Sequence, residues 1–205
     1  MSKAHHDTSH DALGPHHRGA HPPLGGCPLM RPDAPSGAEE IKTLVADPPW
    51  PFKDRLPGGG RGAGKHYRLM SIPDICRVAL PPLAGDSRLF LWVPGAFLRD
   101  AFTVMDAWGF RDTGSQLVWH KLGRMGMGRR LRMEHEYVLL GERGRPAVLS
   151  HSWRSVLATT PGRHSEKPEA FYDQVEMFSP GPYADWFARR QRPGWVCWGD
   201  ELEEE

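Results

Sequence analysis

The sequence predicts a doubly wound α/β fold, with helices on both faces of one sheet. Short apolar runs alternate with helical patterns along most of the chain, and short links join them. One such run, residues 88–93, is apolar almost throughout, as a strand of a parallel sheet covered on both faces requires. The chain's 205 residues are enough for one domain with a substantial core.

Residues 1–40 are expected to form a disordered tail, because histidine, glycine and proline dominate them and no apolar periodicity is present. Met30 offers a second candidate start, so the sequence leaves open whether residues 1–29 are translated. We expect the folded domain to cover residues 41–201, and residues 202–205 to form a short acidic tail.

The first predicted strand, residues 41–46, leads directly into Asp47-Pro48-Pro49-Trp50. The first proline cannot donate a hydrogen bond to the sheet, and two consecutive prolines keep the chain stiff and extended. A carboxylate and a rigid carbonyl therefore follow the end of a strand, where open α/β sheets bind ligands. A planar amine could donate its two hydrogens to Asp47 and to the Pro48 carbonyl, with its base stacked on Trp50. The structural alternative is a proline-rich turn with a buried tryptophan.

Asp-Pro-Pro-Trp after a strand resembles the active-site signature of the MT-A-type (METTL-like) adenine methyltransferases. That family includes the catalytic subunit of the mRNA adenosine methyltransferase and DNA-modifying relatives from bacteria and phages. The resemblance covers residues 41–201 and favours the bacterial and phage branch. It implies a Rossmann-like fold in which the catalytic motif precedes the cofactor motif, with S-adenosylmethionine as the methyl donor. The catalytic residues it implies are Asp47, Pro48, Pro49 and Trp50.

Residues 51–65 are rich in glycine, and we interpret them as a lid beside the active site. Residues 59–65 also fit most of a phosphate-binding P-loop. However, His66 stands where such a loop has its magnesium-binding Ser or Thr, and no strand leads into the loop. The segment that follows resembles a family segment in which an aromatic residue lies near the target base. This makes Tyr67 a candidate substrate-binding residue.

The middle of the chain alternates between helical and extended patterns. A helix over residues 71–79 is indicated by a capping serine and by a proline and an aspartate in its first turn. An amphipathic helix is predicted over residues 96–107, and a glycine closes it. Strands are predicted over residues 88–93, 115–120 and 134–140.

Residues 121–132 hold five basic residues, no acidic residue and no apolar periodicity. Most runs of charge are solvated loops, but cations beside a base-binding site are candidates for phosphate contact. The candidate phosphate-binding residues are Arg124, Arg129, Arg130 and Arg132. In the next strand, Glu134 and His135 resemble an acidic–histidine pair of the family, to which the sequence assigns no chemical role.

A helix is predicted from Pro168, in its first turn, to about Phe178. Lys167 therefore lies at the helix N-terminus, where the helix dipole disfavours a cation unless an anion shares the position. In the family, the matching lysine holds the carboxylate of S-adenosylmethionine. The resemblance and the dipole argument both make Lys167 a candidate cofactor-binding residue.

The last two predicted strands, residues 184–188 and 195–198, lead into the remaining candidate cofactor-binding residues. These are Arg189, Asp200 and Glu201. An acidic residue at the end of a strand in such a fold commonly binds ribose hydroxyls. The resemblance places a cation at the Arg189 position, whereas the family has amides where Asp200 and Glu201 stand.

Composition restricts the class of protein. The formal net charge is only +1, so any surface that binds nucleic acid must be local. The three cysteines lack metal-ligand spacing, which predicts a reducing cytoplasm with neither disulfides nor a metal site. Neither a membrane span nor a signal peptide is recognisable, so we expect a soluble cytoplasmic protein without membrane association.

We therefore expect an S-adenosylmethionine-dependent methyltransferase that modifies the exocyclic 6-amino group of adenine in nucleic acid, in DNA rather than RNA. A duplex substrate would have to release its adenine from the stack. Three alternatives stay open: a non-catalytic nucleic-acid-binding partner subunit of the same family, a cytosine-amine methyltransferase and a P-loop phosphotransferase. The sequence does not decide between DNA and RNA. It also leaves open the recognition sequence and whether the protein forms a homodimer or a heterodimer.

Overall fold

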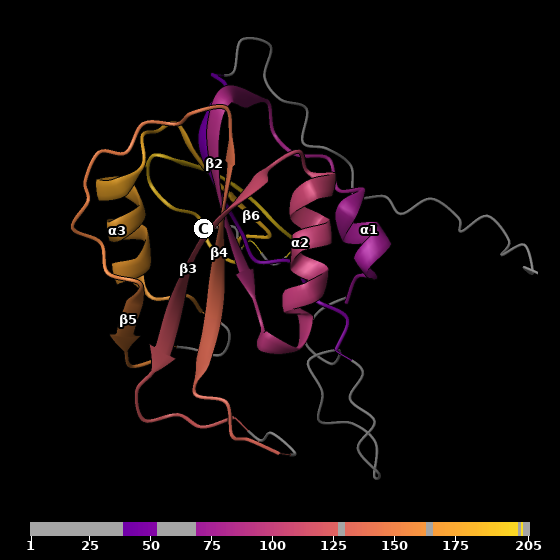
Figure 1. The fold of residues 1–205 in the computed structure, drawn as a ribbon, viewed down its shortest axis with the longest axis vertical. Coiled ribbons are helices and arrows are strands. Elements are labelled where there is room, and N and C mark those ends of the chain that lie inside the picture. Colours follow the sequence, from indigo (N-terminus) through magenta and orange to yellow (C-terminus); the bar gives the residue numbers. More distant parts are fainter. Residues whose placement is uncertain (1–38, 53–68, 127–129, 163–165, 201, 203–205) are drawn as a thin grey trace, which may run out of the picture. The chain divides into compact units, whose positions relative to one another are not determined.

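A mixed β-sheet is the framework of the computed structural model, which describes residues 39–52, 69–126, 130–162, 166–200 and 202 (Figure 1). Seven strands of this part of the chain lie in the order β5-β3-β4-β2-β1-β6-β7. Their bounds are β1 Ile41–Ala46, β2 Leu83–Val93, β3 Arg111–Lys121, β4 His135–Arg143, β5 Val156–Thr159, β6 Tyr183–Trp186 and β7 Trp195–Trp198. All the described residues belong to one unit, residues 31–205.

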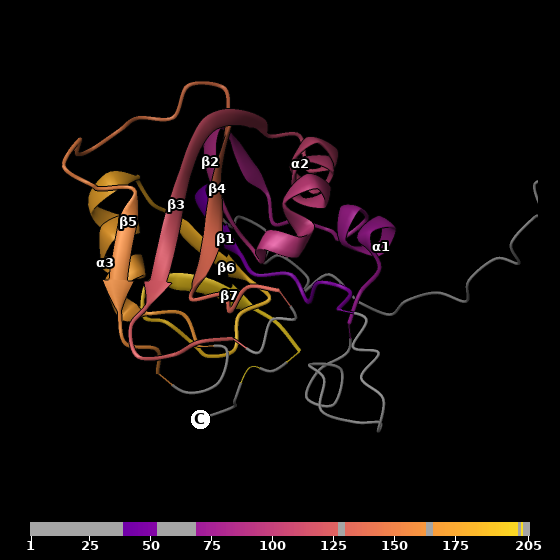
Figure 2. The same ribbon diagram turned by 60° about the horizontal axis from the view of Figure 1, so that its bottom comes forward.

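Strand β4 is antiparallel to both of its neighbours, β2 and β3, and the other pairings in the sheet are parallel. The first residues of β4 therefore lie at the edge where β1, β2 and β3 end. We call this edge the carboxyl edge, and Figure 2 brings it forward (Figure 2). The apolar pattern of the chain predicted the strand but not its reversed direction.

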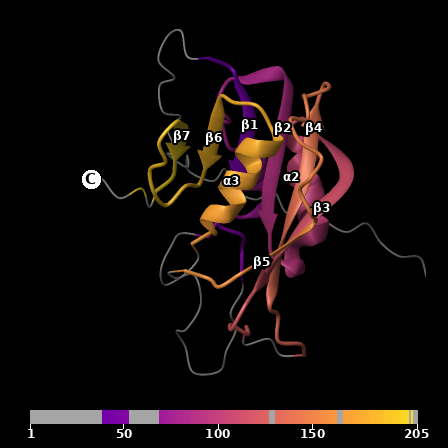
Figure 3. The same ribbon diagram turned by 90° about the vertical axis from the view of Figure 1, so that its left-hand side faces the viewer.

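Helices cover both faces of the sheet, as predicted (Figures 1 and 3). Helix α3 (Glu169–Phe178) covers one face, where its buried Phe171, Tyr172 and Val175 join a core with strand residues such as Phe90 and Val138. Helices α1 (Ile72–Cys76) and α2 (Leu98–Ala107) cover the other face. A short 3-10 helix, η2 (Gly95–Phe97), precedes α2.

Helix α2 lies close to β4 because Gly141 has no side chain. A Cβ atom at Gly141 would lie 2.9 Å from the sulfur of Met105 and 3.0 Å from Cβ of Phe110. Helix α1 is held beside α2 by the Trp108 indole, whose N–H donates to the Ile75 carbonyl at 3.0 Å. No helix of the described residues is long and apolar enough to cross a membrane.

The α/β class is confirmed, and most element bounds differ from the prediction only at their ends. Helix α1 begins after Ser71, whose hydroxyl accepts from the Asp74 N–H as predicted for a cap, but it ends at Cys76. Strand β6 ends at Trp186 and not at residue 188, because Phe187 adopts a positive φ of 66°, which no strand contains. Strand β5 was not predicted: it has only four residues, and none of them is fully buried.

Candidate active site at the carboxyl edge

The motif that follows β1 is held by its own backbone. The Asp47 N–H donates to the Trp186 carbonyl on β6 at 3.2 Å, which continues the pairing of β1 with β6. The Trp50 N–H donates to the Pro48 carbonyl at 2.8 Å, and the Met70 N–H donates to the Pro49 carbonyl at 2.9 Å. The stiffness predicted from the two prolines thus becomes a fixed turn. The Pro48 oxygen keeps a second lone pair for another donor.

Trp50 is part of the core and is only 2% exposed. Its indole N–H donates to the Trp92 backbone carbonyl at 3.0 Å, and its ring stacks on Phe97 of η2, with centroids 5.7 Å apart. In this structure its ring face is not free to stack on a base, contrary to the sequence-based interpretation. The physical reason is that a buried indole needs both a hydrogen-bond acceptor and apolar neighbours, and β2 and η2 provide them. Trp50 therefore anchors the end of the motif in the core.

Lys167 lies between two carboxylates, and its side chain is 10% exposed. Its Nζ atom is 2.9 Å from Asp47 Oδ2 and 2.9 Å from Glu136 Oε2, and it lies 4.7 Å from the centre of the Trp92 ring. Helix α3 begins only at Glu169, with Pro168 as its N-cap. The anions that compensate this cation are therefore already present in the chain itself, whereas the sequence analysis expected an anion of the cofactor.

Glu136, the second residue of β4, is the functional candidate that the sequence analysis missed. Its Oε1 atom contacts the Nζ atom of Lys121, the last residue of β3, while its Oε2 atom contacts Lys167. Asp47, Lys167, Glu136 and Lys121 thus form a row of alternating charges, which we call the charge ladder. A signal for Glu136 was available: it lies two residues before Val138 on the buried face of its strand, where an acidic residue needs a partner.

The Glu134–His135 pair resembles the family's acidic–histidine pair. The contacts described for these two side chains are with residues outside the charge ladder. Glu134 is half exposed, with its Oε2 atom 3.6 Å from Nε2 of His120. His135 instead shares a 2.9 Å hydrogen bond with the Tyr137 hydroxyl and packs edge-on against that ring. The acid of this segment that contacts Lys167 is therefore Glu136, two positions after Glu134.

The electrostatics of the ladder favour its charged form. Burial disfavours the charged form of Lys167, but the Asp47 and Glu136 carboxylates outweigh this effect and raise the pKa of Lys167. Burial likewise opposes ionisation of Glu136, but Lys167 and Lys121 outweigh it and lower the pKa of Glu136 to about 2. Lys167 and Glu136 are therefore both ionised at neutral pH.

A second buried acid lies beside β1. Asp185 of β6 pairs in register with Val45, is 7% exposed and accepts a 2.8 Å hydrogen bond from the Tyr172 hydroxyl. Burial raises its pKa to about 7, with the Asp47 charge adding to the effect and the Tyr172 hydrogen bond opposing it. The Arg192 guanidinium covers the Tyr172 ring, 3.6 Å from its centre. No sequence signal separated Asp185 from other strand residues.

The predicted cofactor-binding residues at the ends of β6 and β7 are brought close together. The Ala188 N–H donates to the Trp198 carbonyl at 2.9 Å, and a Cβ atom at Gly199 would lie 2.1 Å from the Ala188 oxygen. Only glycine permits this contact, which places half-buried Arg189 and exposed Asp200 next to these touching segments. Glu201 lies outside the described residues.

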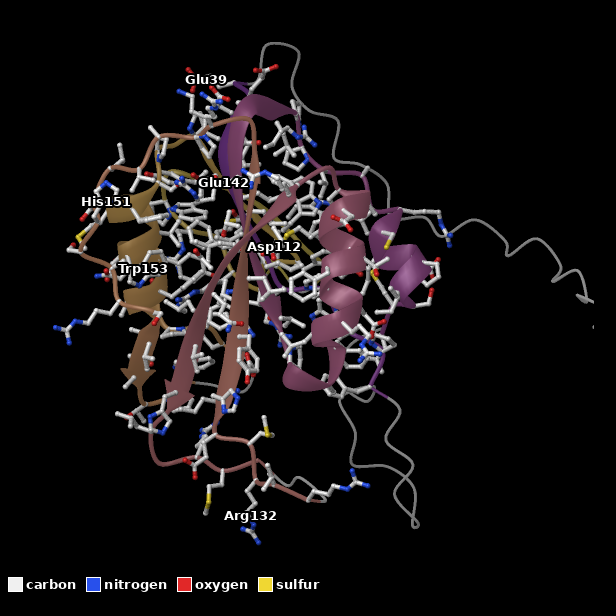
Figure 4. The ribbon with its side chains drawn as sticks, in the orientation of Figure 1. Glu39, Asp112, Arg132, Glu142, His151 and Trp153 are labelled. Atoms are coloured by element: carbon white, nitrogen blue, oxygen red, sulfur yellow. The ribbon has the colours of Figure 1, made fainter. Side chains whose placement is uncertain are left out.

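The predicted substrate-binding arginines lie on the connection between β3 and β4. Arg124, Arg130 and Arg132 are exposed, and Arg132 lies beyond the carboxyl edge, at the opposite end of the sheet from Glu39 (Figure 4). Arg129 and Tyr67 lie outside the described residues, so their predicted roles have no structural counterpart here. Within the described ranges, no group of three or more His, Cys, Asp or Glu side chains could hold a metal ion.

Comparison with known proteins gives a consistent match. Residues 41–201 match the family model described as MT-A70. The N(6)-adenosine-methyltransferase MT-A70-like protein of Drosophila melanogaster is 27% identical over 175 residues, which are 80% of this chain and 27% of the relative. The human N(6)-adenosine-methyltransferase catalytic subunit METTL3 is 26% identical over 175 residues, with coverages of 80% and 28%. The N6-methyladenosine RNA methyltransferase MTA1 of Pyricularia oryzae is 29% identical over 190 residues, with coverages of 80% and 48%. The chain thus spans about a quarter of the first two relatives and about half of the third.

Proposed function

Because the chain belongs to the MT-A70 family, we propose that it transfers a methyl group from S-adenosylmethionine to the 6-amino group of adenine in nucleic acid. The observation that carries this proposal is the Asp47–Lys167 pair, 2.9 Å apart at the carboxyl edge. The relatives are named as adenosine methyltransferases, which agrees with an amine as the methyl acceptor.

The donors and acceptors at this edge fit the cofactor. S-adenosylmethionine carries an ammonium and a carboxylate on its amino-acid end, and its sulfonium supplies the methyl group. Lys167 offers an ammonium that complements the cofactor's carboxylate, beside the Asp47 carboxylate. An ammonium has three donors, and two of those of Lys167 are directed at Asp47 and Glu136. The third is the one we assign to the cofactor's carboxylate, while Arg189 and Asp200 are assigned to its nucleoside.

The same motif can orient the amine. Lys167 holds Asp47 Oδ2, and we assign Oδ1 as the acceptor for one amine hydrogen. The remaining lone pair of the Pro48 carbonyl accepts the other hydrogen. With both hydrogens held, the nitrogen lone pair would turn out of conjugation with the ring and become available to attack the methyl group. Attack of this nitrogen on the methyl group would break the bond between the methyl carbon and the sulfonium sulfur and leave the nitrogen positively charged. The Asp47 carboxylate would stabilise that charge and take up the proton that is released.

The connection between β3 and β4 bears on the kind of substrate. The exposed arginines between β3 and β4 support a substrate with phosphates. DNA is the substrate expected from the sequence, whereas the Pyricularia relative is named as an RNA methyltransferase. Matched DNA and RNA oligonucleotides that contain adenine, and a cytosine-only control, distinguish these substrates in one assay.

The first prediction tests Asp47. Asp47→Asn keeps the size of the side chain but removes the negative charge that would stabilise the positive amine, so turnover should fall by about two to three orders of magnitude, as for loss of one transition-state electrostatic contact. Transfer of labelled methyl groups to the oligonucleotides measures this. Asp106→Asn, an exposed position on α2, is the matched control and should keep wild-type turnover. Near-normal turnover of the Asp47 variant would refute the assignment. Binding of oligonucleotide without any transfer by the wild type would favour a non-catalytic partner subunit.

A further inference from the structure

Lys121 occupies the outer end of the charge ladder. It is the last residue of β3, its backbone N–H donates to the Glu134 carbonyl at 2.7 Å, and the register pair two residues earlier joins Trp119 to Glu136. Lys121 and Glu136 are therefore diagonal neighbours on one face of the sheet. The Lys121 Nζ atom contacts Glu136 Oε1 and lies 4.7 Å from the centre of the Trp119 ring. Its side chain is 25% exposed.

The two lysines divide the Glu136 carboxylate between them. Lys121 contacts Oε1 and Lys167 contacts Oε2, so the plane of the carboxylate is fixed by a cation at each end. Without Lys121, one oxygen loses its partner and the carboxylate can rotate toward Lys167. The Lys167 ammonium would then be drawn from Asp47 toward Glu136, because two carboxylates compete for one cation. The described groups that face Glu136 are Lys121 from β3 and Lys167 from the segment before α3, with Asp47 of the β1 end behind Lys167.

We propose that Lys121 is a positioning residue for the methyl transfer: by holding Glu136 Oε1, it directs Oε2 at Lys167 and so fixes the Lys167 ammonium against Asp47. This inference depends on the proposed function for its effect on turnover. It does not depend on that function for its effect on the ionisation of Glu136. Lys121 acts through two other side chains and touches neither of the reacting groups.

A direct role for Lys121 in binding nucleic acid is the rival explanation, because the residue begins the basic connection that holds Arg124, Arg130 and Arg132. The two roles differ in what they change. A phosphate contact contributes to substrate affinity and to its salt dependence. A positioning role contributes to the turnover of bound substrate, since misplacement of reacting groups slows the chemical step.

The kinetic experiment compares Lys121→Met, Lys121→Arg and Lys42→Met, the last an exposed lysine in the first half of β1. We expect Lys121→Met to lower kcat by about tenfold to a hundredfold. The KM for oligonucleotide should stay within about twofold, as for an interaction made only in the transition state. Lys121→Arg should restore most of the turnover, and Lys42→Met should match the wild type. A higher KM with unchanged kcat and a weaker salt dependence would overturn the proposal.

A double-mutant cycle tests whether Lys121 acts through Glu136. If it does, Lys121→Met should lower turnover little further in a Glu136→Gln background, because that variant already lacks the carboxylate that Lys121 holds. Fully additive losses in kcat would overturn the proposal. The cycle also controls for a general loss of stability, which would add in both backgrounds.

A titration without catalysis separates this inference from the proposed function. The Glu136 side-chain carboxyl can be followed by carbon NMR and assigned by its loss in Glu136→Gln. Its pKa should rise in Lys121→Met, because Lys121 is one of the two cations that lower it, and Lys121→Arg should keep it low. An unchanged titration would overturn the positioning role even in an active enzyme. A shifted titration in a protein that methylates no oligonucleotide would support the contact while refuting the proposed function.

Discussion

Two buried tryptophans at the candidate active site differ in what their indole N–H groups contact. Trp50 donates to the Trp92 backbone carbonyl, whereas the N–H of Trp92 has no hydrogen-bond partner among the described residues. Removal of the Trp50 N–H would leave the buried Trp92 carbonyl without this donor, which costs free energy. Removal of the Trp92 N–H would leave no acceptor unsatisfied.

Trp50→Phe should therefore destabilise the fold more than Trp92→Phe, by about 1–3 kcal/mol in the free energy of unfolding. Both residues are almost completely buried, so the loss of ring volume is matched between the two variants. Urea denaturation of each variant measures the difference. Equal losses would mean that the Trp50 hydrogen bond contributes nothing net to stability.

Asp185 makes the stability of the fold depend on pH. Its pKa is about 7 in the folded protein, and its ordinary value is 3.8. Between these values the unfolded chain has released a proton that the folded protein still binds, so the free energy of unfolding falls as pH rises toward 7 and then levels off. Asparagine does not titrate, and it can keep a hydrogen bond with the Tyr172 hydroxyl.

Asp185→Asn should therefore gain stability relative to the wild type as the pH rises. The gain should be about 2–3 kcal/mol between pH 5 and pH 8, at about 1.4 kcal/mol per pH unit below the folded pKa. Denaturation of both proteins across this range measures the difference, with exposed Asp106→Asn as the control that should show none. A difference that does not change with pH would show that Asp185 is ionised in the folded protein.

Local signals in the sequence predicted part of this site. Asp47 follows a strand and precedes two prolines, and Lys167 precedes the proline of a helix start, so each could be placed from its immediate neighbours. For Glu136 the neighbours in its strand indicate only that the acid needs a partner. They do not identify that partner, because Lys121 and Lys167 lie 15 and 31 residues away along the chain. Trp50 was placed correctly in the chain but given the wrong surroundings, since Phe97 and the Trp92 carbonyl reach it only through the fold.

The connection between β6 and β7 is joined to the start of α3 by arginines. Arg192 donates to both oxygens of Glu169, at 2.6 and 3.2 Å, and Arg190 contacts Glu166 at 2.9 Å and also Glu169. Glu169 is half exposed, but the Arg192 side chain is only 14% exposed and covers the Tyr172 ring. Most of the contribution of this contact should therefore come from the packing of Arg192 and not from the ion pair.

Arg192→Ala should lower the free energy of unfolding by about 1–3 kcal/mol, because it removes both the cation over the ring and the packed stem of the side chain. Glu169→Gln keeps the shape of its side chain and should cost at most about 1 kcal/mol, as exposed ion pairs do. Chemical denaturation of the two variants measures this ranking. The reverse order would mean that the ion pair dominates.

Elements were predictable where burial was periodic. The regular apolar faces of α2 and α3, and the continuous apolar run in β2, predicted these elements. Strand β5 lacks such a pattern because it lies at the edge of the sheet, with Val156 57% exposed. The reversed direction of β4 depends on its pairing with β2 and β3, which no local pattern encodes.

For the whole molecule, near-neutral charge requires that any contact with nucleic acid be local. If the connection between β3 and β4 binds phosphates, replacement of its arginines by alanine should lower the dependence of affinity on salt by roughly one unit of slope per phosphate-contacting residue. The four arginines are Arg124, Arg129, Arg130 and Arg132. Oligonucleotide binding across a salt series measures the slope, and Arg99→Ala, an exposed position on α2, is the control. An unchanged slope in the quadruple variant would make this connection an ordinary solvated loop.

The position of β1 between β2 and β6 has a consequence for how the protein is made. The ribosome produces β1 before the other strands described here, yet Thr43 pairs with Tyr183 of β6, far along the chain. Translation of the intervening residues takes on the order of ten seconds. During that time β1 can pair only with β2, and its other edge stays open to unwanted strand pairing. Lys167 also emerges late, so the nascent chain holds Asp47 long before the cation that orients it. The site should therefore be completed in one of the last folding steps, and a chain stalled before β6 should be inactive and prone to aggregate.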